Sequence, residues 1–540
     1  MYKMKKTGSF TVALIFLVTF IFSGCGATNS TTTTGSTTKL EATASTNGET
    51  ATITTAKWDT TKKRKIIFAT INNYYTTALK QVAKDYTALH PETEVVLDIM
   101  DGGAYQQAFT TRITGDKSTA PDIIHTNCAA PNDGEAMAKG WFMPMDDLVD
   151  APNPYNNVNI RDTIDSEWWA FATCSEGKIA YLPFDLVGVG VFYNKDAFTK
   201  LGIQPPKTYD EYYALCDKIK QSGYDTPIAA TGTADWMLIG LADWAYRKYL
   251  PEIVSMPGDA RYDEKTMKAN IALGNFDPND PTYGSNAIAD PEKYIKFVKS
   301  FNRKSEVSKR IWTTYIKLTQ YFQKGWPALN DDQAYAQFMA QKAPMYITGS
   351  WMVGKILGDM KKLSDDRKFS WGTFSFPGLT DPGTDFQGVQ RGLLVPGHRL
   401  GIANKGDDDL YYRAADFLQY MYSPKIAAQI YDTTVKSGEY IQGPSLIKGV
   451  ELSNEVISYL EGFKVAGNMR FDFFNFEFDN LSNDGATMND AKAKFSQGKI
   501  TWDEFVNIKE EVMQKKFADT IKQNNYDLDP KTKDVENATK

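Results

Sequence analysis

Polar and aromatic side chains follow each of the first three predicted strands, where loops leave the sheet. Carboxylates and amides at such positions can bond the adjacent hydroxyls of a sugar, and a tyrosine can stack beneath the sugar ring. The candidates are Asn72, Asn73 and Tyr74 after the first strand, Asp101 and Tyr105 after the second, and Asn127 after the third. Simple turn chemistry is the alternative for the asparagine pair. The residue types indicate hydrogen bonding and ring stacking as the chemistry of this edge.

Strands and helices alternate in the region that holds these candidates. The expected elements are strand 65–69, helix 76–89, strand 94–99, helix 105–114 and strand 122–125. This alternation favours an α/β lobe with a parallel, doubly wound sheet, in which ligands bind beyond the carboxyl ends of the strands. The candidate loops are therefore expected to meet at one edge.

Later segments continue the alternation and carry clear helix ends. A helix over 195–201 stops at Gly202, and Thr208 with Glu211 forms a capping box for the next helix. The sequence also predicts helix 331–341, strand 343–348, helix 409–422, a helix that begins at Pro424, and a helix capped by Thr501 and Glu504.

The first 25 residues have the composition of an export signal. Lysines near the N-terminus precede an uncharged apolar stretch over 10–22, which is too short to span a bilayer. The following Ser23-Gly24-Cys25 completes a segment that resembles a bacterial lipobox, which implies that Cys25 is lipidated. An ordinary signal peptide with an incidental cysteine is the alternative. We expect a protein on the outer face of the bacterial cytoplasmic membrane, held by its lipid alone through a Thr-rich tether over 27–56.

The composition argues against nucleic-acid binding and against a metal site. The chain has 540 residues, a net charge of −6 and a mean hydropathy of −0.41, which suits a body of two or more domains. No basic stripe is present, so nucleic acid is not an expected partner. The three histidines lack metal-ligand spacing, and we expect no metal and no cofactor. Cys128, Cys174 and Cys216 are widely spaced, and free thiols are preferred to a disulfide between two of them.

Several motifs occur in a fixed order along the chain. They are GKIAYLPF at 177–184, GVFYNKDAF at 190–198, FMAQKAPMYITGSW at 338–351, Trp371-Gly372, Phe376-Pro377-Gly378, AADFLQYMYSP at 414–424 and Gly498-Lys499. Together, behind a lipobox and a linker, they resemble the extracellular solute-binding proteins that feed sugars to ABC importers, the family that includes maltose-binding protein. The resemblance covers nearly all of the chain from Lys65 onward.

This resemblance implies a two-lobed periplasmic-binding-protein-like fold, hinged, with a ligand cleft between two doubly wound lobes. Crossings are expected near 184–186, 385–391 and 421–424. The implied boundaries are a signal peptide over 1–24, lipidated Cys25 and tether over 25–61, the first lobe over 62–185 and 387–422, and the second lobe over 186–386 and 423–540, with an insertion over 251–309 and C-terminal helices. A monomer is expected, whose closed form the ABC permease subunits recognise.

Trp351 carries the strongest individual prediction. The motif Gly349-Ser350-Trp351 matches the tryptophan that stacks on sugar in maltose-binding protein, and the alternative is a helix-start residue that packs into the second lobe. Further candidates are Trp236 after strand 228–231, Phe184 and Asp185 at the expected hinge, Arg391, and the aromatic run 471–478. Their alternatives are core packing, hinge support, a surface salt bridge for Arg391, and a buried face for the aromatic run.

Other functions stay open on the sequence alone. A secreted glycoside-acting enzyme needs two carboxylates at a set separation, and acidic residues are plentiful. However, neither a GxSxG nor an HExxH motif occurs, and no catalytic residue is expected. A binding protein for a peptide, a polyamine or a phosphate ester is the second alternative, and an adhesin or a sensor partner with the same fold is the third.

Overall fold

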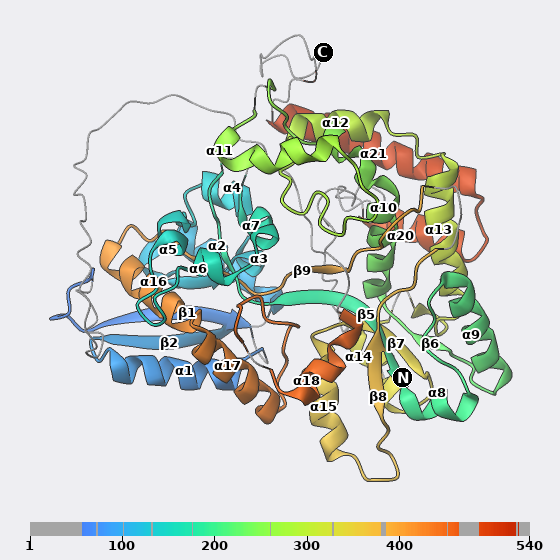
Figure 1. Ribbon diagram of the computed structural model, residues 1–540, viewed down its shortest axis with the longest axis horizontal. Helices are drawn as coiled ribbons and strands as arrows, with labels where there is room; N and C mark the ends of the chain where they lie inside the picture. The colour runs from blue at the N-terminus through green and yellow to red at the C-terminus, as the bar shows by residue number, and fades with distance from the viewer. Residues whose placement is uncertain are drawn as a thin grey trace, which may run out of the picture.

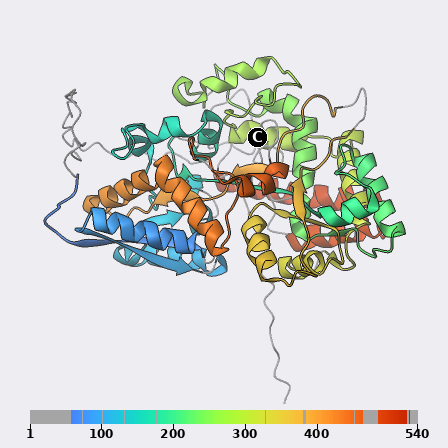
Figure 2. The same ribbon diagram turned by 60° about the horizontal axis from the view of Figure 1, so that its bottom comes forward.

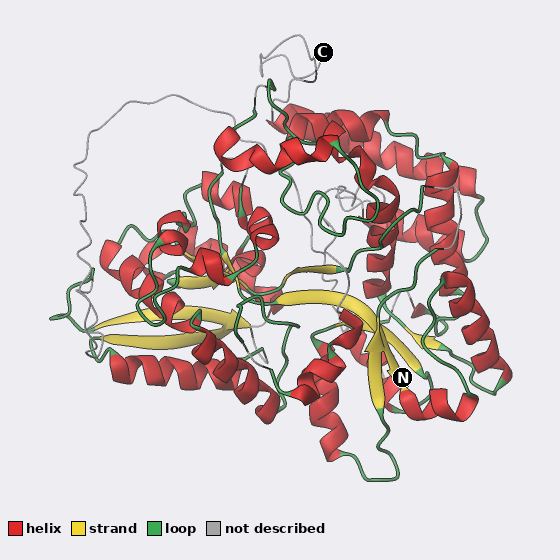
Figure 3. Ribbon diagram, viewed as in Figure 1, coloured by secondary structure: helices red, strands yellow, loops and turns green. Residues whose placement is uncertain are grey.

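Two mixed sheets divide the protein into two lobes in the computed structural model (Figures 1 and 3). The structure describes residues 57–71, 74–100, 102–130, 133–174, 177–259, 261–326, 329–379, 385–450, 452–463, 485–524 and 528. The expected signal peptide, Cys25, most of the tether, Asn72, Asn73, Asp101 and the aromatic run 471–478 lie outside the described residues.

The first lobe is built on a five-stranded sheet with the order β2-β1-β3-β10-β4. The strands are β1 (Arg64–Ile71), β2 (Thr93–Met100), β3 (Ile123–His125), β4 (Leu182–Pro183) and β10 (Arg399–Ile402). β1 runs parallel to β2 and β3, with Ile66 opposite Val95, whereas β10 is antiparallel to β3 and β4. The expected parallel sheet is therefore mixed, because β10 brings the chain back from the second lobe in the opposite direction.

Helices cover both faces of this sheet. They are α1 (Thr76–Leu89), α2 (Gly102–Thr114), η1 (Lys117–Thr119), α3 (Thr126–Ala129), α4 (Asp133–Ala138), α5 (Asp146–Asp150), α6 (Ile160–Thr163), α7 (Ser166–Ala172), α16 (Asp408–Met421) and α17 (Pro424–Ser437). α1 buries Leu79, Val82 and Tyr86 at helical spacing, which fixes the face that it turns to the sheet.

The second lobe has a sheet with the order β6-β7-β5-β8, and β9 also pairs with β5. The strands are β5 (Leu186–Asn194), β6 (Ile228–Ala229), β7 (Met345–Gly349), β8 (Trp371–Phe374) and β9 (Leu394–Pro396). The helices are α8 (Lys195–Leu201), α9 (Tyr209–Gln221), η2 (Gly232–Asp235), α10 (Trp236–Tyr246), η3 (Arg247–Glu252), α11 (Glu264–Met267), η4 (Lys268–Gly274), α12 (Pro291–Ser300), α13 (Glu306–Thr319), α14 (Asp331–Met339), α15 (Met352–Lys362), α18 (Asn454–Tyr459), η6 (Glu461–Phe463), α20 (Gly485–Ser496) and α21 (Trp502–Asn524).

The long strand β5 connects the lobes. Its first residues pair with β9, and its later residues pair with β7 and β8 (Figure 1). One apolar cluster also continues across the connection, since it holds Phe68 of β1 together with Phe192 of β5 and Tyr346 of β7. Apolar side chains of both lobes therefore pack against one another at the hinge.

Most predicted elements occur where they were expected, and their ends have the expected causes. α8 ends at Gly202 with a φ of +60°, and Thr208 Oγ1 accepts a hydrogen bond from Glu211 N at 3.1 Å. Thr501 and Glu504 form the predicted reciprocal capping box. α14 ends at Met339, earlier than expected, because Gln341 turns the chain with a φ of +56°.

The three described cysteines, Cys128, Cys174 and Cys216, are free thiols.

α17 packs against α1 of the first lobe, although it follows the predicted last crossing at 421–424. The predicted domain boundaries stay predictions, and the start of the last second-lobe segment at residue 423 has the least support.

Candidate functional site

Tyr74 stands at the end of β1, where the first lobe faces the second. Its backbone forms a parallel bridge with Tyr440, and the two rings meet edge to face with centroids 5.2 Å apart. A further edge contact joins Tyr74 to His398 at 5.9 Å. Burial raises the pKa of Tyr74, and the nearby Tyr440 and Asp331 raise it further. The tyrosine therefore stays neutral, and its hydroxyl can donate a hydrogen bond close to an acidic side chain.

The second lobe supplies a carboxylate and a cation near this pair of rings. Asp331 is exposed in the first turn of α14, and its carboxylate accepts a hydrogen bond from Thr231 Oγ1 at 2.7 Å. Lys355 of α15 lies 5.0 Å from the ring centre of Tyr335 and 5.9 Å from that of Tyr440. None of these residues was predicted. Tyr440 follows no predicted strand, and Asp331 has the sequence signal of an ordinary acid in a first helical turn.

Trp351 lies between β7 and α15, as the strand–helix order predicts. It is half-buried and packs against both of the larger apolar clusters. A Cβ at Gly349 would lie 1.8 Å from the indole ring, so only glycine leaves room for the ring here. Ser350 Oγ accepts a hydrogen bond from Gly188 N at 3.1 Å and donates one to Gln442 O. The indole is therefore held next to the chain segments that join the lobes.

Tyr105 is fully buried inside the first lobe. Its hydroxyl donates to Ala69 O at 2.9 Å and accepts from His125 N at 3.0 Å. The ring shares a cluster with Phe109 and Ile113, which follow it at helical spacing on α2. Its side chain thus braces the ends of β1 and β3 and is not presented to a ligand.

Asn127 is exposed on α3, and its Nδ2 donates a hydrogen bond to Gly397 O at 3.4 Å. Nearby, Arg399 Nη1 lies 3.4 Å from Asp133 Oδ2, and the guanidinium lies 5.2 Å from the ring centre of Tyr181. Burial raises the pKa of Asp133, and Arg399 opposes that shift. Arg399 and Asp133 are therefore engaged with each other. Asn127 is uncharged and exposed, which suits a side chain that hydrogen-bonds hydroxyl groups.

Phe184 and Trp236 occupy packed positions. Phe184 is 2% exposed, and it stacks on Tyr431 with ring centroids 6.0 Å apart and an interplanar angle of 12°. Trp236 is half-buried as the first residue of α10 and packs against the core of the second lobe. Phe184 therefore supports the hinge, whereas Trp236 keeps part of its surface accessible.

Asp185 is fully buried where the chain passes from β4 to β5. Its carboxylate accepts hydrogen bonds from Tyr75 Oη at 2.8 Å and from His398 N at 2.7 Å, and it contacts His398 Nδ1 at 2.8 Å. Its backbone oxygen accepts from Gly397 N at 2.8 Å, and its backbone bridges to Ser445. The carboxylate therefore joins separate hinge segments rather than pointing to a ligand.

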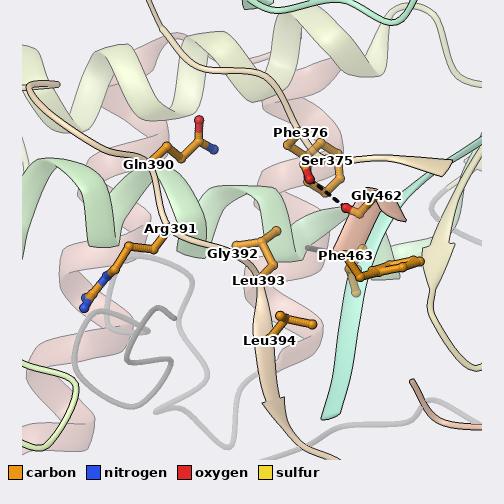
Figure 4. A pocket seen from close by; sticks show the side chains of 10 residues that line it. Ser375, Phe376, Gln390, Arg391, Gly392, Leu393, Leu394, Gly462 and Phe463 are labelled. Carbon is orange, nitrogen blue, oxygen red and sulfur yellow. Dashed lines mark hydrogen bonds between the residues drawn. The ribbon is translucent and has the colours of Figure 1, made fainter. Parts of the chain in front are cut away.

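Arg391 forms an ion pair, as one alternative expected, but the pair is buried and not on the surface. Its guanidinium bonds the Asp243 carboxylate with two nitrogens and donates from Nη1 to Tyr283 O at 2.7 Å. The residue also lines a cavity of about 60 Å³ between β5, β9 and η6, in which Ser375 Oγ donates to Gly462 O (Figure 4). Ligand pockets are typically about 300–1,000 Å³, so this cavity is too small for a sugar ring.

The part of the chain that the structure describes contains no group of three or more His, Cys, Asp or Glu side chains that could hold a metal ion. Within the same residues, no helix combines the length and the apolar character needed to cross a membrane.

A family model described as bacterial extracellular solute-binding protein matches residues 72–428, which is more than half of the chain. The chain belongs to this family. It is a solute-binding protein of ABC transport, and the family binds its solutes without transforming them.

Two curated relatives share part of the sequence. The multiple sugar-binding protein of Streptococcus mutans is 24% identical over 69% of this chain and 72% of its own length. The sn-glycerol-3-phosphate-binding periplasmic protein UgpB of Yersinia pestis is 22% identical over 54% of this chain and 59% of its own length.

A solved structure shares the fold. The solute-binding protein RafE in complex with raffinose superposes with a TM-score of 0.54 at 18% identity, over 84% of this chain and 100% of that one. The two-lobed α/β architecture predicted from the sequence is confirmed by this likeness.

Proposed function

We propose that this protein captures a sugar or an oligosaccharide between its lobes and delivers it to the permease subunits of an ABC importer. The observation that carries the proposal is the contact of Tyr74 with Tyr440, within electrostatic range of Asp331 and beside the helix that Trp351 precedes. Aromatic faces match the C–H faces of sugar rings, and carboxylate or amide groups match their hydroxyls.

The proposed site keeps the predicted residues that lie outside the described part of the chain, keeps the described ones that have accessible surface, and adds three residues found near the hinge. Its members are Asn72, Asn73, Tyr74, Asp101, Asn127, Trp236 and Trp351 from the sequence, with Asp331, Lys355 and Tyr440 added. The buried Tyr105, Phe184, Asp185 and Arg391 are proposed to support the site without contacting the ligand.

The charges around the site favour a neutral ligand. Arg399 already lies against Asp133, and Lys355 lies 3.8 Å from Asp359. The exposed carboxylate of Asp331 adds a negative charge that would repel a phosphate group. The sugar-binding relative supports the same inference. The glycerol-phosphate-binding relative makes a phosphate ester the alternative.

A ligand screen on the detergent-solubilised full chain tests this proposal. A ligand at about 100 times its Kd stabilises the folded state by about 2.7 kcal/mol, so a thermal-shift assay detects it readily. We expect a neutral mono- or oligosaccharide to raise the melting temperature and glycerol 3-phosphate to have no effect. A shift with glycerol 3-phosphate alone would identify a phosphate-ester receptor. Shorter sugars released on long incubation would favour the glycosidase alternative.

We also propose that Cys25 is lipidated and anchors the protein to the outer face of the cytoplasmic membrane. The Ser23-Gly24-Cys25 motif and the Thr-rich segment behind it motivate this step. Cys25→Ala is expected to abolish incorporation of labelled palmitate and to change processing of the signal peptide. Unchanged labelling and unchanged processing in that variant would refute the anchor.

A further inference from the structure

The insertion over 251–309 arches from the second lobe toward the first, with α11 lying over α4 and α7 (Figures 1 and 2). It begins at the end of η3 and carries α11, η4, α12 and the first residues of α13. Its hydrogen bonds with the second lobe are buried, whereas its hydrogen bond with the first lobe joins two exposed residues. This difference indicates that one end is fixed and the other is free to move.

The fixed end is attached through two buried arginines. Arg247 is 0% exposed, and its Nη2 donates to Pro278 O at 2.8 Å and to Val389 O at 2.5 Å. Arg391 bonds Asp243 of α10 and the backbone oxygen of Tyr283 in the insertion. The buried Arg391–Asp243 ion pair holds a single geometry, because leaving either partner unpaired in the interior is costly, and Arg247 adds two hydrogen bonds to backbone oxygens.

The insertion also contacts residues 387–391, which precede β9 and lead to the hinge. Val389 N donates to Pro278 O at 2.9 Å, and Trp244 Nε1 donates to Gln387 O at 2.8 Å. Gly388 has a φ of +74°, and a Cβ there would lie 1.9 Å from Pro278 O. Residues 387–391 therefore bind the insertion tightly, and the chain runs on from them through β9 to β10 of the first lobe.

The hydrogen bond between the insertion and the first lobe is long and exposed. Asn286 Nδ2 donates to Ser166 Oγ of α7 at 3.4 Å, and both residues are exposed. The neighbouring Glu167 is half-buried and lies within electrostatic range of Arg391. Phe171 of α7 packs against apolar clusters that extend into the second lobe. The hydrogen bond that docks the insertion on α7 is therefore one that a small movement can break.

We infer that residues 251–309 form a strap, fixed to the second lobe, that docks reversibly on α7 and sets how far the lobes can separate. This inference rests on the proposed function, in which the lobes move around a ligand. None of the proposed ligand contacts belongs to residues 251–309, so the strap acts on lobe separation and not on ligand chemistry. A docked strap retains the ligand, and an undocked strap lets the lobes open.

Small-angle scattering without any sugar tests the strap directly. The double variant Ser166→Ala/Asn286→Ala removes the docking hydrogen bond, and we expect a larger radius of gyration than in the parent protein. Asn279→Ala is the matched control, because Asn279 is exposed on the same segment and its side chain makes no hydrogen bond to the described residues. An unchanged radius in the double variant overturns the inference, whatever the screen for sugars finds.

A cross-link provides the reciprocal measurement. In the double variant Ser166→Cys/Asn286→Cys, oxidation forms a disulfide that is expected to fix the distance between the lobes. The radius of gyration of the oxidised protein should then stay the same when a sugar that binds the protein is added. The same sugar should dissociate at least about tenfold more slowly from the oxidised than from the reduced form, since affinity changes within one site fall mainly on dissociation. Oxidised protein that still compacts, or that releases sugar at the reduced rate, contradicts the strap.

Discussion

Asp416 is a buried carboxylate that accepts hydrogen bonds from two tyrosines, and His90 Nε2 lies 3.7 Å from its Oδ2. Tyr86 Oη and Tyr155 Oη donate to its Oδ2 at 2.7 and 2.6 Å. Burial raises the pKa of Asp416 above its usual value of 3.8, the tyrosine hydroxyls and His90 lower it, and Glu92 raises it. Because the net change in pKa is upward, the folded protein holds this proton more tightly than the unfolded chain does. The ionised side chain therefore costs stability at neutral pH.

Asp416→Asn is expected to stabilise the protein at pH 7, because the amide oxygen can accept both tyrosine bonds without carrying a charge. The cost of the carboxylate appears as the pH rises above 3.8 and is complete above the raised pKa. A tenfold difference in proton affinity between the folded and unfolded states corresponds to about 1.4 kcal/mol of stability. Urea unfolding at pH 7 and pH 4 should show a gain that shrinks at the lower pH. Asp432→Asn, on the exposed face of α17, should change little; equal gains in both variants would contradict the assignment.

Trp351→Ala is expected to weaken sugar binding by about thirtyfold or more, since truncation of a buried anchor typically costs about 2 kcal/mol or more. Isothermal calorimetry with the sugar found in the screen measures the change. Trp141→Ala, at a half-buried indole of the first lobe, is the control and should bind as the parent does. Parent-like affinity in a folded Trp351→Ala variant would remove Trp351 from the site.

The sequence could place Trp351 because a strand, a glycine and a helix start surround it locally. It also contained the signal that Tyr105 is a core residue, since Tyr105, Phe109 and Ile113 recur at helical spacing. The partner of Arg391 could not be predicted, because Asp243 lies 148 residues away and only the folded chain brings the two together. Tyr440 was missed for the same reason.

At the scale of elements, α15 is shaped to receive the backbone of residues 438–440. A Cβ on Gly354 would lie 2.1 Å from Glu439 O, and a Cβ on Gly358 would lie 3.3 Å from Gly438 Cα. On its other side, the Glu439 carboxylate accepts a hydrogen bond from Thr77 N at the start of α1 at 2.8 Å. This segment therefore lies between a helix of each lobe.

Gly354→Ala is expected to destabilise the protein, because Glu439 O belongs to the backbone and cannot move aside alone. Overpacking costs about 1–3 kcal/mol, which outweighs the gain of about 1 kcal/mol from replacing a helical glycine with alanine. Gly358→Ala makes the same exchange on the same helix with a much milder contact, so it should be close to neutral or stabilising. Denaturant unfolding compares the two, and a smaller loss in Gly354→Ala than in Gly358→Ala would refute the packing argument.

Helices with strong local signals were predicted closely, whereas the mixed strand order of the first sheet was not. α1 matches its predicted range because its apolar face and its flanking residues define it locally. The antiparallel strand β10 depends on the chain returning through the hinge, which no local pattern encodes. The packing of α17 against α1 likewise depends on contacts between distant residues.

At the scale of the molecule, the two lobes share buried structure. The buried Asp185 joins the hinge segments through Tyr75, His398 and the Ser445 backbone. One apolar cluster runs from β1 in the first lobe to β5 and β7 in the second. Lobe movement must therefore pivot about a packed base, and the strap at 251–309 bridges the lobes at a second place.

This continuity predicts a single cooperative unfolding transition for both lobes. If either lobe unfolded alone, it would expose the part of the shared cluster that the other lobe covers, and the exposed apolar surface would destabilise the remaining lobe. Differential scanning calorimetry of the ligand-free protein should give one peak whose calorimetric and van't Hoff enthalpies agree. Asp185→Asn should move that peak to lower temperature without splitting it, because the variant weakens the hinge and leaves the shared cluster in place. Two resolved peaks in the parent protein would mean that the lobes are separate folding units joined by a hinge that carries little stability.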